Sequence, residues 1–149
     1  MSQEPTDLDT PELQTDIVAF DRERETLYAI RQRVFVEEQG VPEAIEHDAL
    51  DPSCIHVLAR WQGAPVGTGR LTPNGRIGRM AVLPDHRRFG IGSALLERLL
   101  DAARERGFKE IVLAAQVSAI TFYERFGFKA EGVVFEEAGI DHLMMRRTL

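Results

Sequence analysis

One stretch decides what the sequence indicates about the fold: Arg79-Met-Ala-Val-Leu-Pro-Asp-His-Arg-Arg-Phe-Gly-Ile-Gly-Ser-Ala-Leu-Leu96. Its apolar first part predicts a strand that ends at Pro84, and its leucines begin an amphipathic helix. Two arginines and two glycines lie between the strand and the helix. Unpaired backbone N–H groups and positive charge therefore converge on one point, where a phosphate group can bind.

Two common phosphate-binding motifs do not fit this loop. A Walker loop ends in Gly-Lys-Ser/Thr, and no lysine is present here. The dinucleotide motif needs a third glycine where Leu95 stands. What remains is Arg87-x-x-Gly90-x-Gly92, whose glycines let a ligand approach the backbone while Arg87 and Arg88 contact phosphate oxygens. A plain helix start with solvated arginines is the alternative interpretation.

Composition restricts the class of protein. At 149 residues, with 44% hydrophobic and 28% charged side chains, the chain has the make-up of one globular domain. No apolar run is long enough to span a membrane, and residues 1–10 lack the features of a signal peptide, so we expect a cytoplasmic location. The single cysteine, Cys54, excludes an internal disulfide and a multi-cysteine metal site, and we expect no metal.

Charge is unevenly distributed along the chain. The net charge of −6 disfavours a general nucleic-acid binder. Residues 1–51 carry 14 acidic and 4 basic side chains, whereas residues 52–149 carry 10 and 14. One interpretation is an acidic tail with a solvated helix face. The other is an acidic region for a cationic acceptor beside a basic region for a phosphorylated donor.

The order of the expected elements predicts the architecture. Residues 1–11 form a flexible acidic tail, and residues 12–149 form a single domain. Asp21 and Ser118 are expected to cap the first and third helices. We expect strands at 13–20, 55–61, 66–72, 76–83, 110–115, 128–137 and 141–147, and helices after Asp21, after Gly90 and at 119–126. This order implies a mixed sheet with helices on both faces.

Two segments resemble the signatures of the GNAT superfamily of N-acyltransferases. Met80-Ala-Val-Leu-Pro-x-x-Arg-Arg-x-Gly-Ile-Gly-x-x-Leu-Leu96 is similar to its acyl-CoA-binding signature. Gln116-Val-Ser-Ala-Ile-Thr-Phe-Tyr-Glu-Arg-Phe-Gly-Phe128 is similar to its second signature, which ends in Tyr-x-x-x-Gly-Phe. The resemblance covers about residues 15–149, and the two segments match at the expected separation.

The resemblance implies an α/β (α+β) fold with a mixed, mostly antiparallel sheet of six to seven strands. Strands 4 and 5 would splay apart, with the arm of acetyl-CoA between them. Backbone groups of residues 80–82 would bind the pantetheine, and amides of residues 87–93 the pyrophosphate. The cofactor-binding residues implied are Met80, Ala81, Val82, Arg87, Arg88, Phe89, Gly90, Ile91, Gly92, Ser93, Gln116, Phe122 and Tyr123. Gln116 departs from the asparagine that is frequent in the superfamily.

Tyr123 is the expected general acid. A phenol with its ordinary pKa of roughly 10 can protonate a departing thiolate whose acid has a pKa of roughly 8.5. The resemblance places Tyr123 near the sulfur of CoA. Packing beside Phe122 and Phe126 is the alternative role.

The general base has several candidates, because an attacking amine must lose a proton. They are Glu37, Glu38, Glu46, Asp48, Glu137, His56 and His142. Residues 34–42 and Gly139-Ile-Asp-His142 resemble a bacterial GNAT subgroup with Phe-x-x-Glu-Gln and Gly-Ile-Pro-His segments and largely unassigned substrates. That resemblance favours Glu38 and His142, although Asp141 stands where proline is usual.

We therefore expect an acetyl-CoA-dependent N-acetyltransferase that works by direct attack in a ternary complex. The expected acceptor is a primary amine of a small metabolite, cationic if the acidic N-terminal third binds it. A protein lysine or N-terminal amine is one alternative, and a non-catalytic acyl-CoA-binding sensor is another. Neither nucleic acid nor membrane is an expected partner, and a homodimer stays open.

Overall fold

The computed structural model describes residues 12–46 and 48–149, so the predicted tail, residues 1–11, lies outside the described residues. The strands are β1 (Leu13–Val18), β2 (Ile55–Trp61), β3 (Ala64–Leu71), β4 (Ile77–Val82), β5 (Glu110–Gln116), β6 (Lys129–Glu137) and β7 (Ile140–Thr148). The α-helices are α2 (Phe20–Arg31), α3 (Glu43–Glu46), α4 (Ile91–Glu105) and α5 (Ile120–Glu124). A π-helix, η1 (Gln32–Glu38), extends α2, and η2 (Asp51–Ser53), η3 (Pro84–His86) and η4 (Val117–Ala119) are 3₁₀ turns. No helix in the described part of the chain is long and apolar enough to cross a membrane.

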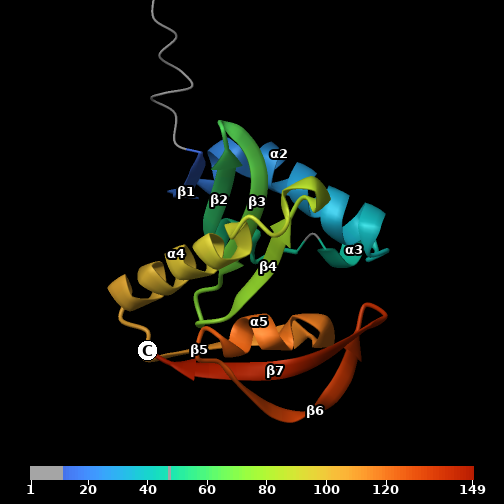
Figure 1. The fold of residues 1–149 in the computed structure, drawn as a ribbon, viewed down its shortest axis with the longest axis vertical. Coiled ribbons are helices and arrows are strands. Elements are labelled where there is room, and N and C mark those ends of the chain that lie inside the picture. The colour runs from blue at the N-terminus through green and yellow to red at the C-terminus, as the bar shows by residue number, and fades with distance from the viewer. Residues whose placement is uncertain (1–11, 47) are drawn as a thin grey trace, which may run out of the picture.

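The strands form two antiparallel sheets that meet at one bridge. Their orders are β1-β2-β3-β4 and β5-β7-β6. The parallel strands β4 and β5 are joined only where Arg76 pairs with Val112, beside a hydrogen bond from the amide of Val112 to the carbonyl of Gly75 (3.1 Å). Beyond that bridge the two strands separate, as Figure 1 shows. The predicted mixed, mostly antiparallel arrangement with a splay between strands 4 and 5 is confirmed.

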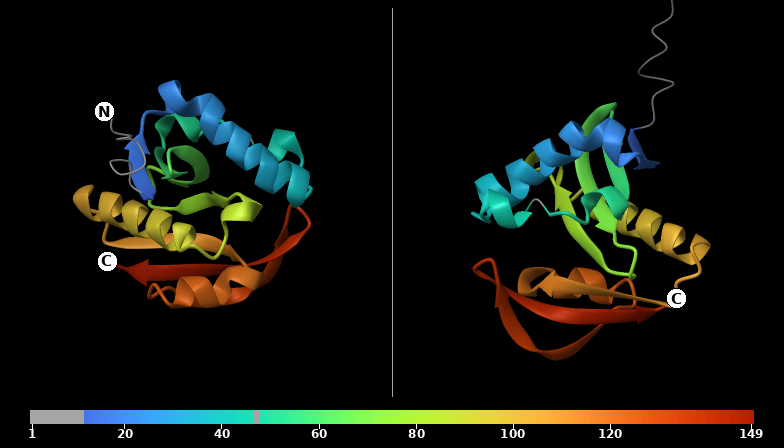
Figure 2. Two further views of the ribbon diagram at one scale, coloured as in Figure 1. Left: turned by 45° about the horizontal axis from the view of Figure 1, so that its top comes forward. Right: turned by 180° about the vertical axis from the view of Figure 1, so that it is seen from behind.

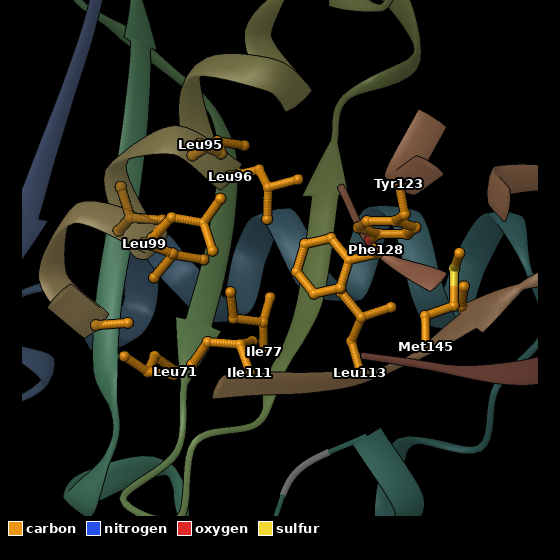
Figure 3. Close-up of a cluster of buried hydrophobic side chains, with 14 of the residues drawn as sticks. Leu71, Ile77, Leu95, Leu96, Leu99, Ile111, Leu113, Tyr123, Phe128 and Met145 are labelled. Atoms are coloured by element: carbon orange, nitrogen blue, oxygen red, sulfur yellow. The ribbon is translucent and has the colours of Figure 1, made fainter. Parts of the chain in front are cut away.

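Helices cover both faces of the four-stranded sheet, as predicted (Figure 2). Alternation in β2 sends Leu58 to one face, where it packs against Leu27 and Ile30 of α2. Val57 lies on the other face, where α4 packs with its leucines. The core on the α4 side continues into the second sheet and α5, as Figure 3 shows. One apolar core therefore joins the two sheets on the side of α4.

Three local expectations were wrong. Helix α2 begins at Phe20 after Ala19, with no side-chain cap, and Asp21 lies in its first turn, where its charge suits the helix dipole. Ser118 caps no helix, because η4 precedes α5. The turn between β2 and β3 is Gln62-Gly63 alone, with φ of +49° and +87°. Such two-residue turns match the twist of the strands, so the pairing begins sooner than predicted.

Two irregular segments border the gap between β4 and β5. After Arg31, the last residue of α2, the chain continues without a break into the wider π-helix η1. π-Helical turns of this kind are frequent at functional sites. In β4, residues 79 and 80 together oppose Gly69 of β3, which makes a β-bulge, and Arg79 has a φ of +52°. A Cβ on Gly69 would lie 2.5 Å from the Met80 sulfur, so a larger residue at this position would displace the Met80 side chain.

Candidate active site

A groove and a cavity occupy the gap between the sheets and adjoin each other. The groove, about 440 Å³, runs along β4 to the start of α4, and the cavity, about 520 Å³, lies between β4 and the second sheet. Gln39, Met80 and Ala119 line both spaces. The predicted cofactor residues that line the groove are Met80, Ala81, Val82, Arg87, Arg88, Gly90, Ile91, Gly92, Ser93 and Phe122.

The start of α4 provides hydrogen-bond donors at one end of the groove. Gly90 is the N-cap in the left-handed conformation, with φ of +78°, and no side chain caps the helix. The amides of residues 91–93 therefore have no acceptor within the helix. The side chain of Arg88 adds positive charge to the same lining. This end of the groove is suited to a phosphate group.

Arg87 spans from the groove to the π-helix. Its guanidinium donates two hydrogen bonds to Glu38 (2.7 and 2.6 Å) and a third to the carbonyl of Val82 (3.0 Å). Hydrogen bonding to Arg87 lowers the pKa of Glu38, so this carboxylate is a weaker base than an ordinary glutamate. Glu38 does not line the cavity. The structure therefore does not bring the proposed base Glu38 together with Tyr123.

Three predicted cofactor residues, Phe89, Gln116 and Tyr123, lie outside the groove lining. Phe89 is 54% exposed and packs on Trp61, with the ring centroids 5.1 Å apart. Gln116 lines the cavity, and its side-chain amide donates a hydrogen bond to Gln39 (2.9 Å). This hydrogen bond joins β5 to the end of the π-helix across the gap. Gln116 thus lies at the boundary between groove and cavity.

Tyr123 lines the cavity from α5. Its ring packs edge-on against Phe122, at a centroid distance of 5.0 Å. It packs in the same way against Phe128, at 6.0 Å (Figure 3). Burial raises the pKa of the phenol to about 12, above the ordinary value that the sequence argument assumed. The hydroxyl donates no hydrogen bond to the described part of the chain. Tyr123 is therefore both a packing residue and a protonated donor beside the cavity.

His142 lines the same cavity from β7 and is 8% exposed. Its Nδ1 lies 2.7 Å from the carbonyl oxygen of Ile140. A carbonyl only accepts hydrogen bonds, so Nδ1 carries a proton, and Nε2 is the ring nitrogen left to accept one. Stacking on Phe135, with centroids 5.9 Å apart, fixes the ring. Asp141 pairs with Glu136 inside the hairpin, after the turn at residues 138–139.

Of the remaining candidates for the general base, some line the cavity and others lie outside it. Glu46, Asp48 and Glu137 line the cavity, whereas Glu37 and His56 do not. His56 is buried on the far side, where Nε2 meets the carbonyl of Asp51 (2.8 Å) and the ring stacks on Phe20 (5.0 Å).

An ion network that the sequence argument missed forms part of the cavity wall and extends into the interior behind it. Its members are Arg31, Glu46, Asp48, Asp51, Arg70 and Arg79. Asp51 is fully buried and accepts hydrogen bonds from Arg31 (3.0 Å) and Arg70 (2.7 Å). The signal available was Arg70 itself, an arginine inside a predicted strand of small and apolar residues.

The network also fixes the loop after α3 to the β4 bulge. Asp48 accepts two hydrogen bonds from Arg70 (both 2.9 Å) and one from Arg79 (3.1 Å). Hydrogen bonding from Arg70 lowers the pKa of Asp48 to about 2, against the effect of partial burial. Arg31 pairs with Glu46, and Arg79 donates to the backbone carbonyl of Glu46 (3.2 Å). Both carboxylates of the N-terminal third that line the cavity are thus neutralised by arginines.

Comparison with known proteins assigns the family. The acetyltransferase (GNAT) domain model matches residues 16–149. The uncharacterized N-acetyltransferase YjcF of Bacillus subtilis is 35% identical over 124 residues, covering 80% of this chain and 89% of YjcF. An acyl-CoA N-acyltransferase from Pseudomonas aeruginosa superposes with a TM-score of 0.80 at 30% identity, over 91% of this chain and 99% of its own.

A more distant solved structure shares the fold. It is the PaiA N-acetyltransferase from Thermoplasma acidophilum, solved in complex with coenzyme A. Its TM-score is 0.68 at 14% identity, over 93% of this chain and 100% of its own. The family expected from the two sequence signatures is confirmed by the family match and the close relatives. The chain belongs to the GNAT family of acetyltransferases.

Proposed function

We propose that this protein transfers the acetyl group of acetyl-CoA to the primary amine of a small molecule, by direct attack in a ternary complex. The observation that carries the proposal is the junction of the groove and the cavity. The groove offers amides and arginines to a phosphate-bearing donor, and the cavity beside it is lined by Tyr123 and His142. Two substrates could therefore meet at the boundary formed by Gln39, Met80 and Ala119.

The groove fits the parts of acetyl-CoA in order. The amides of residues 91–93 and the side chain of Arg88 would hold the pyrophosphate. Strand β4 pairs with β3 on one edge, and past Arg76 its other edge has no strand partner among the described residues. That edge offers backbone groups of residues 80–82 to the amides of the pantetheine. The PaiA enzyme, which has the same fold, was solved in complex with coenzyme A, and this supports a CoA-type donor for the fold.

His142 and Tyr123 would handle the two protons of the reaction. Acetyl-CoA supplies an activated acyl carbon and a thiolate leaving group. As the bond from nitrogen to the acyl carbon forms, Nε2 of His142 accepts the proton that the amine loses. As the bond from carbon to sulfur breaks, Tyr123 donates its hydroxyl hydrogen to the sulfur and stabilises the developing charge.

The raised pKa of Tyr123 bears on whether its hydroxyl transfers a proton to the sulfur or only donates a hydrogen bond to it. Its pKa of about 12 lies well above the roughly 8.5 of an ordinary thiol, so full proton transfer to a solvated thiolate is uphill. The same apolar surroundings raise the pKa of a sulfur bound there, which narrows the difference. Tyr123 therefore acts first as a hydrogen-bond donor, and its high pKa keeps it protonated throughout the physiological range.

The cavity does not require a cationic acceptor. That expectation rested on the acidic N-terminal third, of which Glu46 and Asp48 reach the cavity. Both are neutralised by arginines of the ion network. We therefore propose that the acceptor is a small primary amine, and that groups in the cavity other than Glu46 and Asp48 select the charge of the rest of the acceptor molecule.

Thiol release from acetyl-CoA with a panel of small amines and lysine peptides tests the proposal. We expect time-dependent release of free CoA with small amines, and a product 42 mass units heavier than the amine, the increment of one acetyl group. Arg88→Ala should weaken acetyl-CoA binding, whereas Arg98→Ala, an exposed arginine on α4 outside the groove, should not. Stabilisation by acetyl-CoA without thiol release from any amine would indicate a sensor and contradict catalysis. Release with peptides alone would indicate a protein acceptor.

A further inference from the structure

Among the described residues, the cavity lining holds one arginine outside the ion network, Arg76, and it lies where β4 and β5 meet. Arg76 lines the cavity and is partly buried. Its side chain forms no hydrogen bond or ion pair with the described part of the chain, in contrast to Arg70 and Arg79. An arginine that lines a cavity and has no ion-pair partner there can bind a carboxylate, which its guanidinium can contact through two parallel hydrogen bonds.

The backbone holds Arg76 firmly at this position. Its amide donates to the hydroxyl of Thr72 (3.1 Å), and its carbonyl accepts from the amide of Thr72 (2.8 Å). On the other side it forms the bridge to Val112 that closes the gap between β4 and β5. The backbone from which the Arg76 side chain extends is therefore fixed where β4 and β5 meet, and a bound carboxylate would order the guanidinium itself.

The opposite end of the cavity has the complementary charge. Glu137 lines it from the turn of the β6–β7 hairpin, pairs in register with Ile140, and forms no ion pair with the described residues. His142 lies on the same hairpin, two residues beyond Ile140. The cavity is thus positive where β4 and β5 meet and negative near the proposed base. That polarity fits an acceptor with an anionic group at one end and an ammonium group at the other.

The strand register sets the separation between the two ends. Val112, the partner of Arg76, and Gln116, the partner of His142, are four residues apart on β5. At about 3.3 Å per residue the backbone positions are therefore about 13 Å apart. The side chain of Arg76 spans part of that distance, and the acceptor spans the rest. Its amine and its anionic group must therefore be several bonds apart.

From this arrangement we propose that the acceptor is an extended amino carboxylate whose carboxylate binds Arg76 and whose amine lies at His142. The proposal rests on the proposed acetyl transfer, and it names the substrate class of the same site. It replaces the cationic acceptor expected from the acidic N-terminal third.

A matched set of amines tests the proposal. The compounds are 5-aminopentanoate, pentylamine and 1,5-diaminopentane, which share a five-carbon chain and differ only in the group at the far end. With the unmodified protein, kcat/KM for the amino carboxylate should exceed that for each of the others by about tenfold or more, as expected for one charge-assisted contact. Preference for the diamine or for the neutral amine would overturn the proposal.

Charge reversal at Arg76 provides the second arm. Arg76→Glu should invert the order, with the diamine now preferred, while KM for acetyl-CoA stays within about twofold because Arg76 does not line the groove. Arg98→Glu, an exposed arginine on α4 that lines neither space, is the matched control and should leave the order unchanged. An unchanged order in Arg76→Glu would contradict the proposal.

Thermal unfolding in the presence of CoA separates this proposal from the proposed function. The amino carboxylate should raise the midpoint of the unmodified protein and not that of Arg76→Glu, whether or not acetyl transfer occurs. Absence of turnover together with this shift would contradict acetyl transfer and support the carboxylate site. Turnover of amines without the shift would support acetyl transfer and overturn the carboxylate site.

Discussion

The groove and the cavity adjoin, yet the chain builds them in different ways. The groove is formed mostly by residues from one stretch, 80–93, and it offers backbone groups and arginines at the start of a helix. The cavity is formed by side chains from the π-helix, the loop after α3, both sheets and the β6–β7 turn. A site made of backbone groups has few ways to vary, whereas one made of scattered side chains can change its ligand by single substitutions.

The two regions also differ in how their ion pairs are held. At the groove, Glu38 and Arg87 form a pair whose side chains are 35% and 40% exposed. Behind the cavity, Arg31 and Asp51 form a pair that is almost completely buried. Water and salt screen the first pair, whereas the second sits where an unpaired charge is costly. The stability of the cavity wall therefore depends on keeping its buried charges paired, whereas the stability of the groove depends little on its exposed pair.

The largest expected effect separates chemistry from binding of the donor. Tyr123→Phe should lower kcat by about 10²- to 10⁴-fold, because it removes the hydroxyl donor while keeping the buried ring. The dissociation constant of acetyl-CoA should change by less than about threefold, since Tyr123 lines the cavity rather than the groove. Steady-state kinetics with calorimetric binding measure both quantities. Equal losses in binding and turnover would place Tyr123 in the donor site.

The second effect compares the two kinds of ion pair directly. Asp51→Asn should lower the free energy of unfolding by about 3–5 kcal/mol, because it leaves the buried network of three arginines with two carboxylates and one uncompensated positive charge. Glu38→Gln, the control at the exposed pair, should change it by less than about 1 kcal/mol. Urea unfolding monitored through Trp61 gives both values. Similar losses in the two variants would contradict the distinction.

The third effect concerns pH. The pKa of Asp48 is about 2 in the folded chain, below its ordinary 3.8, so this carboxylate stabilises the fold above about pH 4 and ceases to do so as the pH falls towards 2. Asp48→Asn should therefore be less stable than the unmodified protein at pH 7. The difference should shrink between about pH 4 and pH 2. Thermal midpoints across that range measure it, and a constant difference would argue against the ion pairs with Arg70 and Arg79.

The smallest expected effect belongs to the groove. Glu38→Gln should tighten CoA binding by a few-fold, about 1 kcal/mol or less, because it removes a negative charge beside the proposed phosphate site and frees Arg87. Added salt should weaken this gain, since the pair is exposed. Calorimetric titration at two ionic strengths tests it. Weaker binding in this variant would instead indicate that Glu38 positions Arg87 for the donor.

The difference between the regions also explains what could be predicted from the sequence. The strand, loop and helix around Gly90 and Gly92 lie on consecutive residues, so a phosphate-binding loop could be predicted from one segment. The splay and the residues along the groove were implied by the resemblance of residues 80–96 and 116–128 to the GNAT signatures. The bond between Gln39 and Gln116 and the pair between Glu38 and Arg87 join residues far apart in the chain, and no local pattern indicates them.

The cavity was less predictable for the same reason. Whether a carboxylate is available to act as a base depends on which arginine lies beside it. Asp51, for example, is brought next to Arg31 of α2 and Arg70 of β3 only by the tertiary fold. The raised pKa of Tyr123 follows from burial, which depends on packing rather than on sequence spacing. The roles of Tyr123 and His142, the cytoplasmic location, the single-domain boundary and a homodimer stay predictions.

The central claim is that groove and cavity meet where a donor in the first presents its acyl group to an acceptor in the second. A crystal structure of the protein with CoA tests it most directly. We expect the pyrophosphate at the amides of residues 91–93 and the sulfur within hydrogen-bond reach of the Tyr123 hydroxyl, directly or through one water molecule. A CoA molecule whose sulfur ends outside the gap between β4 and β5, away from Tyr123, would contradict the claim.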